Sequence, residues 1–205
     1  MELKQRIQER LKGTRPNLDL SQARTGGITV ESAHLADRMP PERVRPAAVL
    51  VPLIDRPDGL TVLFTERAAH LKNHAGQVSF PGGRIEEQDA SPLNAALRET
   101  EEEIGLAREF VQVLGYLESH LVFTGFHVVP VVGLVRPGFS LKLDEKEVAG
   151  VFEAPLIHLL DATHHTTRTR DTPGGTVHIY DIVYGDKSVW GATAGMMMSL
   201  YRLLK

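Results

Sequence analysis

The sequence of 205 residues contains no cysteine. Disulfide bonds, thiolate metal sites and a cysteine nucleophile are therefore excluded. Long apolar runs are missing as well, because the longest, AAVLVPLI from Ala47 to Ile54, is far shorter than the roughly 20 residues of a membrane-spanning helix. The N-terminal stretch MELKQRIQERLKG is charged and lacks the apolar core of a signal peptide. We therefore expect a cytoplasmic protein.

An excess of charge of one sign is also absent. The chain has 23 Lys and Arg against 26 Asp and Glu, a formal net charge of -3, and no basic block stands out. This balance gives no reason to expect nucleic acid or an anionic membrane as a partner, and it favours a small molecule. The hydrophobic share of 42% and the charged share of 24% are ordinary for a globular protein.

The chain is long enough for one substantial domain with an extension. Leu3, Ile7 and Leu11 recur at helical spacing and predict a short N-terminal helix that ends near Gly13. A segment rich in proline, arginine and turn residues follows. We therefore predict an N-terminal helix and extension over residues 1–46 and the main domain over 47–205. The helix also suits a possible homodimer.

Strand-like and helix-like segments alternate through the main domain. AAVLVPLI and TVLFTER, separated by RPDG, predict a β-hairpin. Further strands are predicted at QVSF, FVQVLGYLE, VVPVVGLVR, KEVAGVFE and TVHIYDIVYG, and helices over 91–104, 156–160 and 192–205. His164 and His165 are expected in a polar loop, and Met196–Met198 in the core of the last helix. This order predicts an α/β domain with a mixed sheet between helical layers.

The most informative stretch is PGGRIEEQDASPLNAALRETEEEIGL, which begins at Pro81. Ser91 is a good cap and the proline after it suits the first helical position, so a helix should begin there. At roughly 100° per residue, Glu99, Glu102 and Glu103 lie on one face of that helix. Ala95 and its neighbour Ala96 precede them on the same face, where we expect their small side chains to leave space.

A run of glutamates is most often a solvated helix face. Here, however, carboxylates three and four residues apart repel one another by a few tenths of a kcal/mol per pair. A divalent cation such as Mg²⁺ or Mn²⁺ reverses that repulsion, because it accepts carboxylate oxygens and shares its shell with phosphates. Arg98 can pair with a neighbouring carboxylate and orient it. Gly82 and Gly83, after a predicted strand, let phosphate or the helix approach the backbone closely.

This arrangement resembles the Nudix box, G-x5-E-x7-R-E-U-x-E-E-x-G-U with U apolar. The second half matches from Arg98 to Leu106, with Thr100 at the first U position. The first half departs from it, because fourteen residues instead of thirteen separate Gly83 from Arg98, and Asp89 stands where the first Glu is expected.

The departure resembles the coenzyme A pyrophosphatase branch of the family. That branch has a preceding signature of the form L-x-T-x-R-x-x-x-L-x-x-H-x-G-Q-V-x-F-P-G-G, and this chain reads LFTERAAHLKNHAGQVSFPGG from Leu63 to Gly83. The resemblance implies a Nudix fold, an α/β/α sandwich with a central mixed β-sheet. It also implies hydrolysis of coenzyme A, or an acyl derivative, to 3′,5′-ADP and 4′-phosphopantetheine or its acyl form.

The resemblance assigns roles to residues of this chain. Glu99, Glu102 and Glu103, with the backbone of Gly83, are expected to hold Mg²⁺ or Mn²⁺. The general base is one of these glutamates or Glu147, which lies in the later segment DEKEV; the alternative for Glu147 is a solvated loop charge.

Three residues of the preceding signature are candidates for substrate binding. Arg67 and Lys72 suit substrate phosphates, although each is as readily explained as a surface charge. His74 either contacts phosphate or orients a water, or it only hydrogen-bonds backbone. Gly82 and Gly83 complete the predicted substrate-binding set.

Two other functions stay open. The first is a Nudix hydrolase for another nucleoside diphosphate derivative, such as ADP-ribose or a nucleotide sugar, which the preceding signature disfavours. The second is a non-catalytic Nudix-fold binding module, for which we would expect one of Glu99, Glu102 or Glu103 to be replaced. All three are present, so the sequence favours a hydrolase.

Overall fold

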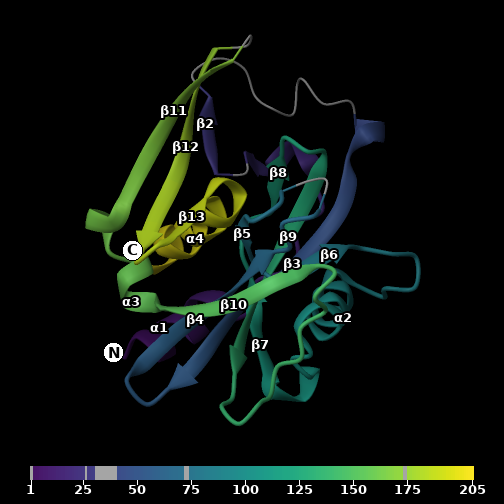
Figure 1. Cartoon of the computed structure of the whole chain (residues 1–205), viewed down its shortest axis with the longest axis vertical. Coiled ribbons are helices and arrows are strands. Elements are labelled where there is room, and N and C mark those ends of the chain that lie inside the picture. The colour runs from purple at the N-terminus through teal and green to yellow at the C-terminus, as the bar shows by residue number, and fades with distance from the viewer. Residues whose placement is uncertain (1, 26, 31–40, 72–73, 173–174) are drawn as a thin grey trace.

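A computed structural model describes residues 2–25, 27–30, 41–71, 74–172 and 175–205. Two β-sheets and several helices make up this part of the chain (Figure 1). The longer helices are α1 (Leu3–Leu11), α2 (Pro92–Ile104) and α4 (Gly191–Leu204), and α3 (Leu156–Leu159) is a single turn. Short 3-10 turns lie at Leu20–Gln22, Pro41–Arg43, Arg108–Phe110 and Ala162–His164.

The larger sheet has nine strands and contains the order β1-β8-β9-β3-β4-β10. Its strands are β1 (Arg24–Thr25), β3 (Arg45–Arg56), β4 (Gly59–Arg67), β5 (Val78–Ser79), β6 (Gly82–Arg84), β7 (Val111–Tyr116), β8 (His120–Val122), β9 (Phe126–Val135) and β10 (Val148–Pro155). β3 runs parallel to β9 and antiparallel to β4, so the sheet is mixed. The predicted hairpin is therefore confirmed as β3 and β4.

The smaller sheet has four strands, with the order β11-β12-β13 and β2 paired to β12. Its strands are β2 (Ile28–Val30), β11 (His165–Thr172), β12 (Gly175–Tyr184) and β13 (Lys187–Trp190). The expectation of a polar loop at His164 and His165 was wrong. His164 ends a 3-10 turn and His165 begins β11, because the polar, threonine-rich segment after it pairs with β12 over its whole length.

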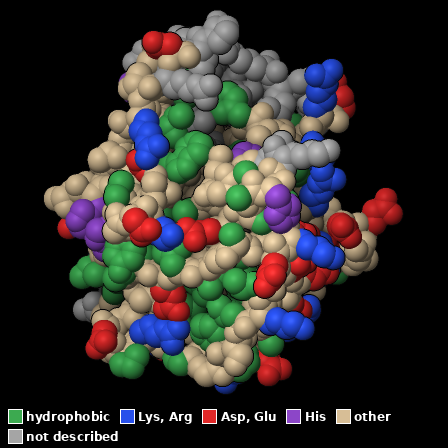
Figure 2. Space-filling view, viewed as in Figure 1, with side chains coloured by type: hydrophobic (Ala, Val, Ile, Leu, Met, Phe, Trp, Pro, Cys, Tyr) green, Lys and Arg blue, Asp and Glu red, His purple; other side chains and the backbone are tan. Residues whose placement is uncertain are grey.

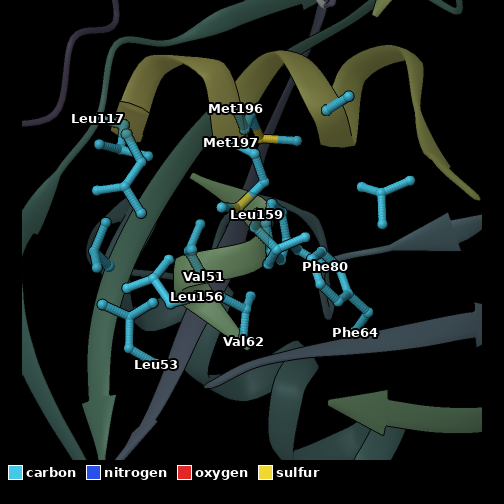
Figure 3. Close-up of a cluster of buried hydrophobic side chains, with 14 of the residues drawn as sticks. Val51, Leu53, Val62, Phe64, Phe80, Leu117, Leu156, Leu159, Met196 and Met197 are labelled. Carbon is cyan, nitrogen blue, oxygen red and sulfur yellow. The ribbon is translucent and has the colours of Figure 1, made fainter. Parts of the chain in front are cut away.

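The two faces of the larger sheet are covered by different helices, as alternate residues of β3 show. Leu50 and Ile54 pack with the buried face of α2, whereas Val51 and Leu53 pack on the other side with α1, α3 and α4. Figure 3 shows this second core, in which Met196 and Met197 of α4 lie near Val51 and Leu159. The predicted α/β/α arrangement is thereby confirmed. Met196 and Met197 are buried as predicted, whereas Met198 is only partly buried.

The N-terminal helix belongs to this core. Ile7 and Leu11 are fully buried in the cluster that contains α4. Lys4 pairs with Asp55 at 2.5 Å, and the Thr14 hydroxyl accepts a hydrogen bond from a backbone N–H of β7. The helix is thus packed against the predicted main domain, and the boundary at residue 46 stays a prediction. Among the described residues, no helix has both the length and the apolar character needed to cross a membrane.

Candidate active site

Local signals fix the ends of α2. The Ser91 hydroxyl accepts a hydrogen bond from the Asn94 N–H at 3.2 Å, and Pro92 occupies the first helical position. Gly105 ends the helix in the left-handed region with φ of 70°. Serine caps, proline at the start and glycine at the end are the preferred residues at these places. The carboxylate-bearing helix therefore has the predicted bounds.

The alanines of α2 do not leave open space as expected. Ala95 and Ala96 are fully buried, together with Thr100 and Ile104, and they pack in the cluster that contains residues of β3. The physical reason is that small side chains allow a helix to approach a sheet closely. The carboxylates are consequently held near the edge of the interface between α2 and the sheet.

The two glycines of β6 contact these carboxylates directly. The Gly82 N–H donates a hydrogen bond to Glu103 Oε2 at 3.0 Å. A Cβ on Gly83 would lie 2.4 Å from the carboxyl carbon of Glu99, which is closer than any real contact allows. Gly82 has φ of 148°, and a Cβ there would meet Ala48 O at 2.4 Å. Gly82 is therefore required by its backbone conformation and by the close approach of β3, whereas a side chain at Gly83 would displace the Glu99 carboxylate.

Arg98 connects the two ends of the glutamate-rich motif. Its guanidinium donates to both oxygens of Asp89, at 3.1 and 2.9 Å. It also donates to Glu99 and Glu102, each at 2.9 Å, and to the backbone oxygen of Arg84 at 3.1 Å. Hydrogen bonds from Arg98 lower the pKa of Asp89.

Asp89 was not among the predicted site residues. The signal that pointed to it was its place in the sequence, where the motif has its first glutamate. Asp89 accepts hydrogen bonds from Arg98 through both of its carboxylate oxygens. A two-point pairing of this kind fixes the orientation of the guanidinium in addition to the charge attraction. Arg98 in turn holds two of the carboxylates of α2.

The carboxylates of α2 differ in environment. Glu103 is only 4% exposed, and burial raises its pKa to about 8, against the opposing effect of the Gly82 hydrogen bond. Burial also raises the pKa of Glu99, although Arg98 opposes this. Glu102 is exposed on the helix surface. Glu101 pairs instead with Arg108, beyond the end of the helix.

Two further residues come close to the buried carboxylates from other strands. Arg67, at the end of β4, has Nη1 3.9 Å from Glu103 Oε1. Glu147 immediately precedes β10, and its backbone oxygen accepts a hydrogen bond from the Ala68 N–H at 2.9 Å. The negative charge of Glu147 contributes to the raised pKa of both Glu99 and Glu103. The exposed Glu147 therefore acts on both carboxylates through its charge.

The remaining predicted residues lie in the segment between β4 and β5. His74 is exposed and has a φ of 59°. Its Nδ1 lies 2.7 Å from Gln77 Oε1, and no hydrogen bond of the described residues joins it to the glutamates. Lys72 lies outside the described residues. The structure therefore brings Arg67, but not His74, to the carboxylates.

The carboxylates of α2 have the chemistry of a hard-cation site, but their side chains do not converge on one point. Within the described ranges, no group of three or more Asp, Glu or His side chains converges closely enough to hold a metal ion. Nevertheless, Glu103 is a buried carboxylate and Glu99 a partly buried one, and the charge of Glu99 contributes to the raised pKa of Glu103. A cation would relieve that cost. Oxygen donors of this kind suit Mg²⁺ or Mn²⁺. In Figure 2, acidic and basic side chains intermingle on the side where Figure 1 places α2.

The chain is similar to proteins of one known family. The NUDIX domain model matches residues 44–173. The uncharacterized Nudix hydrolase NudL of Escherichia coli K12 is 41% identical over 157 residues, which are 76% of this chain and 81% of that protein. Among solved structures, a C. elegans Ap4A hydrolase binary complex is 20% identical with a TM-score of 0.47, and the match covers 54% of this chain and 80% of the other.

Proposed function

The chain belongs to the Nudix family, and we propose that it hydrolyses the diphosphate bond of coenzyme A or an acyl derivative. The products are 3′,5′-ADP and 4′-phosphopantetheine or its acyl form. As a Nudix hydrolase the protein acts on nucleoside diphosphate derivatives. The choice of coenzyme A among them is the proposal.

One observation carries this proposal. The segment from Leu63 to Gly83, which resembles the signature of the coenzyme A branch, meets the carboxylates of α2 at both of its ends. Arg67 lies 3.9 Å from Glu103 near one end, and Gly82 donates to the same carboxylate at the other. Residues of this signature thus lie against the carboxylates of the proposed reaction centre, which supports a link between the signature and the choice of substrate.

Nudix hydrolases generally need divalent metal ions. We propose that Glu99, Glu102 and Glu103, with the backbone of Gly83, hold Mg²⁺ or Mn²⁺ here. When bound, such an ion neutralises charge on the diphosphate and favours attack by water. Arg98 orients Glu99 and Glu102. Arg67 has a buried Nε without a hydrogen-bond partner in the described part of the chain, which supports its proposed role in binding a phosphate oxygen.

We propose Glu147 as the general base. The oxygen of water forms a bond to one phosphorus, the bond from that phosphorus to the bridging oxygen breaks, and the proton of water passes to a carboxylate. Glu147 is an exposed carboxylate whose charge acts on both Glu99 and Glu103, and its backbone oxygen accepts a hydrogen bond from Ala68, the residue after Arg67. It can therefore receive a proton from water near the diphosphate.

Product analysis tests the proposal. Coenzyme A, ADP-ribose and a deoxynucleoside triphosphate are incubated separately with the protein, with Mg²⁺, with Mn²⁺ or with chelator, and the products are identified by mass spectrometry. We expect metal-dependent 3′,5′-ADP and 4′-phosphopantetheine from coenzyme A. Glu102→Gln should lose most of this turnover. Glu101→Gln is the matched control, because Glu101 lies on the same helix but pairs with Arg108. Turnover of ADP-ribose with coenzyme A untouched would refute the proposed substrate.

A further inference from the structure

Two arginines lie against one aromatic ring near the candidate active site. The guanidinium carbon of Arg45 lies 5.0 Å from the centroid of the Phe126 ring, and that of Arg84 lies 5.7 Å from it. Distances under about 6 Å are those of cation–π contacts. We call these three residues the Arg–Phe–Arg cluster. Two positive charges repel one another, and the attraction of both guanidiniums to the Phe126 ring offsets part of that repulsion.

Neither arginine is neutralised by a carboxylate of the described residues. Arg45 and Arg84 are both exposed, and neither side chain takes part in the ion pairs or side-chain hydrogen bonds of the described ranges. Most other arginines near the sheet are paired, for example Arg56 with Glu153 and Arg98 with Asp89. A pair of guanidiniums that has no carboxylate partner in the described ranges suits the oxygens of a phosphate group, which they can bind in a fork geometry.

The cluster is close to the proposed reaction centre. Arg84 directly follows Gly83, which contacts Glu99, and consecutive Cα atoms are about 3.8 Å apart. The backbone oxygen of Arg84 also accepts a hydrogen bond from Arg98. Because side chains alternate along β6, Arg84 points to the face opposite Gly83. A ligand that reaches both places must cross the short strand β6, where two glycines present no side chain.

An exposed aromatic residue lies beside the cluster. Phe123 is 49% exposed and belongs to the turn between β8 and β9, just before Phe126. The Arg45 N–H donates a hydrogen bond to Gly125 O of this turn at 2.8 Å, so the turn and the cluster form one surface at the end of the sheet where β3 and β9 begin (Figure 1). Exposed aromatic rings next to arginines are suited to stacking with a nucleobase.

We propose that the Arg–Phe–Arg cluster is a second phosphate site, which binds a phosphate monoester on the nucleoside part of the substrate, away from the bond that is cleaved. The inference rests on the proposed function, since coenzyme A has such a group at the ribose 3′ position. Arg45 and Arg84 bind the monoester oxygens, and Phe126 holds the guanidiniums in place. The site thus selects nucleoside diphosphate derivatives that carry an additional phosphate.

Paired substrates test the inference. Initial rates are measured with coenzyme A and with 3′-dephospho-coenzyme A, which differ only in the monoester. Hydrogen bonds between charged groups contribute enough to change affinity by roughly tenfold or more. We therefore expect Arg45→Gln and Arg84→Gln each to lower kcat/KM for coenzyme A about tenfold more than for 3′-dephospho-coenzyme A. Phe126→Leu should lower the same ratio by a smaller factor.

Arg10→Gln is the matched control, because Arg10 is an exposed arginine on α1 and its loss changes the net charge equally. It should leave the ratio between the two substrates at the wild-type value. An unchanged ratio in both Arg45→Gln and Arg84→Gln would overturn the inference. A ratio that falls equally in Arg10→Gln would do so too, because net charge alone would then explain the effect.

Binding of products separates this inference from the proposed function. With chelator present, 3′,5′-ADP and AMP are titrated by calorimetry against the wild type and Arg84→Gln. We expect tighter binding of 3′,5′-ADP by the wild type only. If coenzyme A is not hydrolysed but this preference is found, the proposed function fails and the phosphate site stands. If coenzyme A is hydrolysed and the wild type binds both nucleotides equally, the phosphate site fails. Equal competition by inorganic phosphate against both nucleotides would indicate a general anion site and would likewise overturn it.

Discussion

Replacing Glu103 by glutamine should make the protein more stable as it removes activity. Glu103 is almost completely buried, and burial raises its pKa from 4.5 to about 8. Between these two pH values the folded protein keeps a proton that the unfolded chain has released. The free energy of unfolding therefore falls as pH rises through this range. Glutamine has nearly the same shape, its side-chain oxygen still accepts the Gly82 N–H, and it does not ionise.

The size of the effect follows from the same shift. Each pH unit between the two pKa values changes the free energy of unfolding by about 1.4 kcal/mol. With the pKa of Glu103 at about 8, the wild type at pH 7 is destabilised by on the order of 3 kcal/mol relative to Glu103→Gln. For a chain of this length that corresponds to a gain of about 10 °C in Tm. At pH 4.5 the two proteins should unfold at nearly the same temperature.

Thermal unfolding from pH 4.5 to pH 8.5, in chelator, measures this difference. Glu102→Gln is the control, because Glu102 is 60% exposed on the same helix and surface substitutions usually change stability by less than about 0.5 kcal/mol. Glu103→Gln and Glu102→Gln should both lose metal-dependent turnover. A Tm for Glu103→Gln that stays equal to the wild type at every pH would refute the reasoning, because Glu103 would then carry no cost of burial.

Three other predictions follow from contacts of the site and the core. Asp89→Ala should lower kcat about tenfold or more, whereas Asp89→Glu should keep most activity, because glutamate can still pair with Arg98; steady-state kinetics of the two variants decides this. Glu147→Gln should lower kcat with little change in KM, and a kcat like that of the wild type would exclude Glu147 as the base. Leu11→Ala should cost about 2–4 kcal/mol in urea unfolding, and a loss under about 0.5 kcal/mol would mean that α1 is not part of the core.

The elements with strong local signals were predictable from sequence. The hairpin of β3 and β4 has a Pro-Asp-Gly turn, and α2 has its serine cap and terminal glycine. β11 was missed because its polar, threonine-rich sequence has no apolar alternation, and only pairing with β12 makes it a strand. Local propensity is weak where partners distant in sequence decide the structure.

The candidate site was predictable to a similar extent. Helical geometry placed Glu99, Glu102 and Glu103 on one face of α2. It did not give the depth at which each carboxylate lies, because Ala95 and Ala96 were expected to line open space and instead bring the helix against the sheet. The pairing of Asp89 with Arg98 and the approach of Glu147 depend on loops whose paths no spacing rule determines.

The site combines features that are costly for a fold. Gly82 of β6 is required by its backbone conformation, Gly83 leaves room for the Glu99 carboxylate, and two carboxylates of α2 have raised pKa values. A helix selected for stability alone would have lysine among its glutamates and an apolar residue in place of Glu103. The only cation that pairs closely with Glu99 and Glu102 in the described part of the chain is Arg98, which Asp89 holds from outside the helix. The contacts of Arg98 thus orient Glu99 and Glu102, but they leave the pKa of Glu103 raised. The unfavourable free energy of burying the charged form of Glu103 is what cation binding can recover.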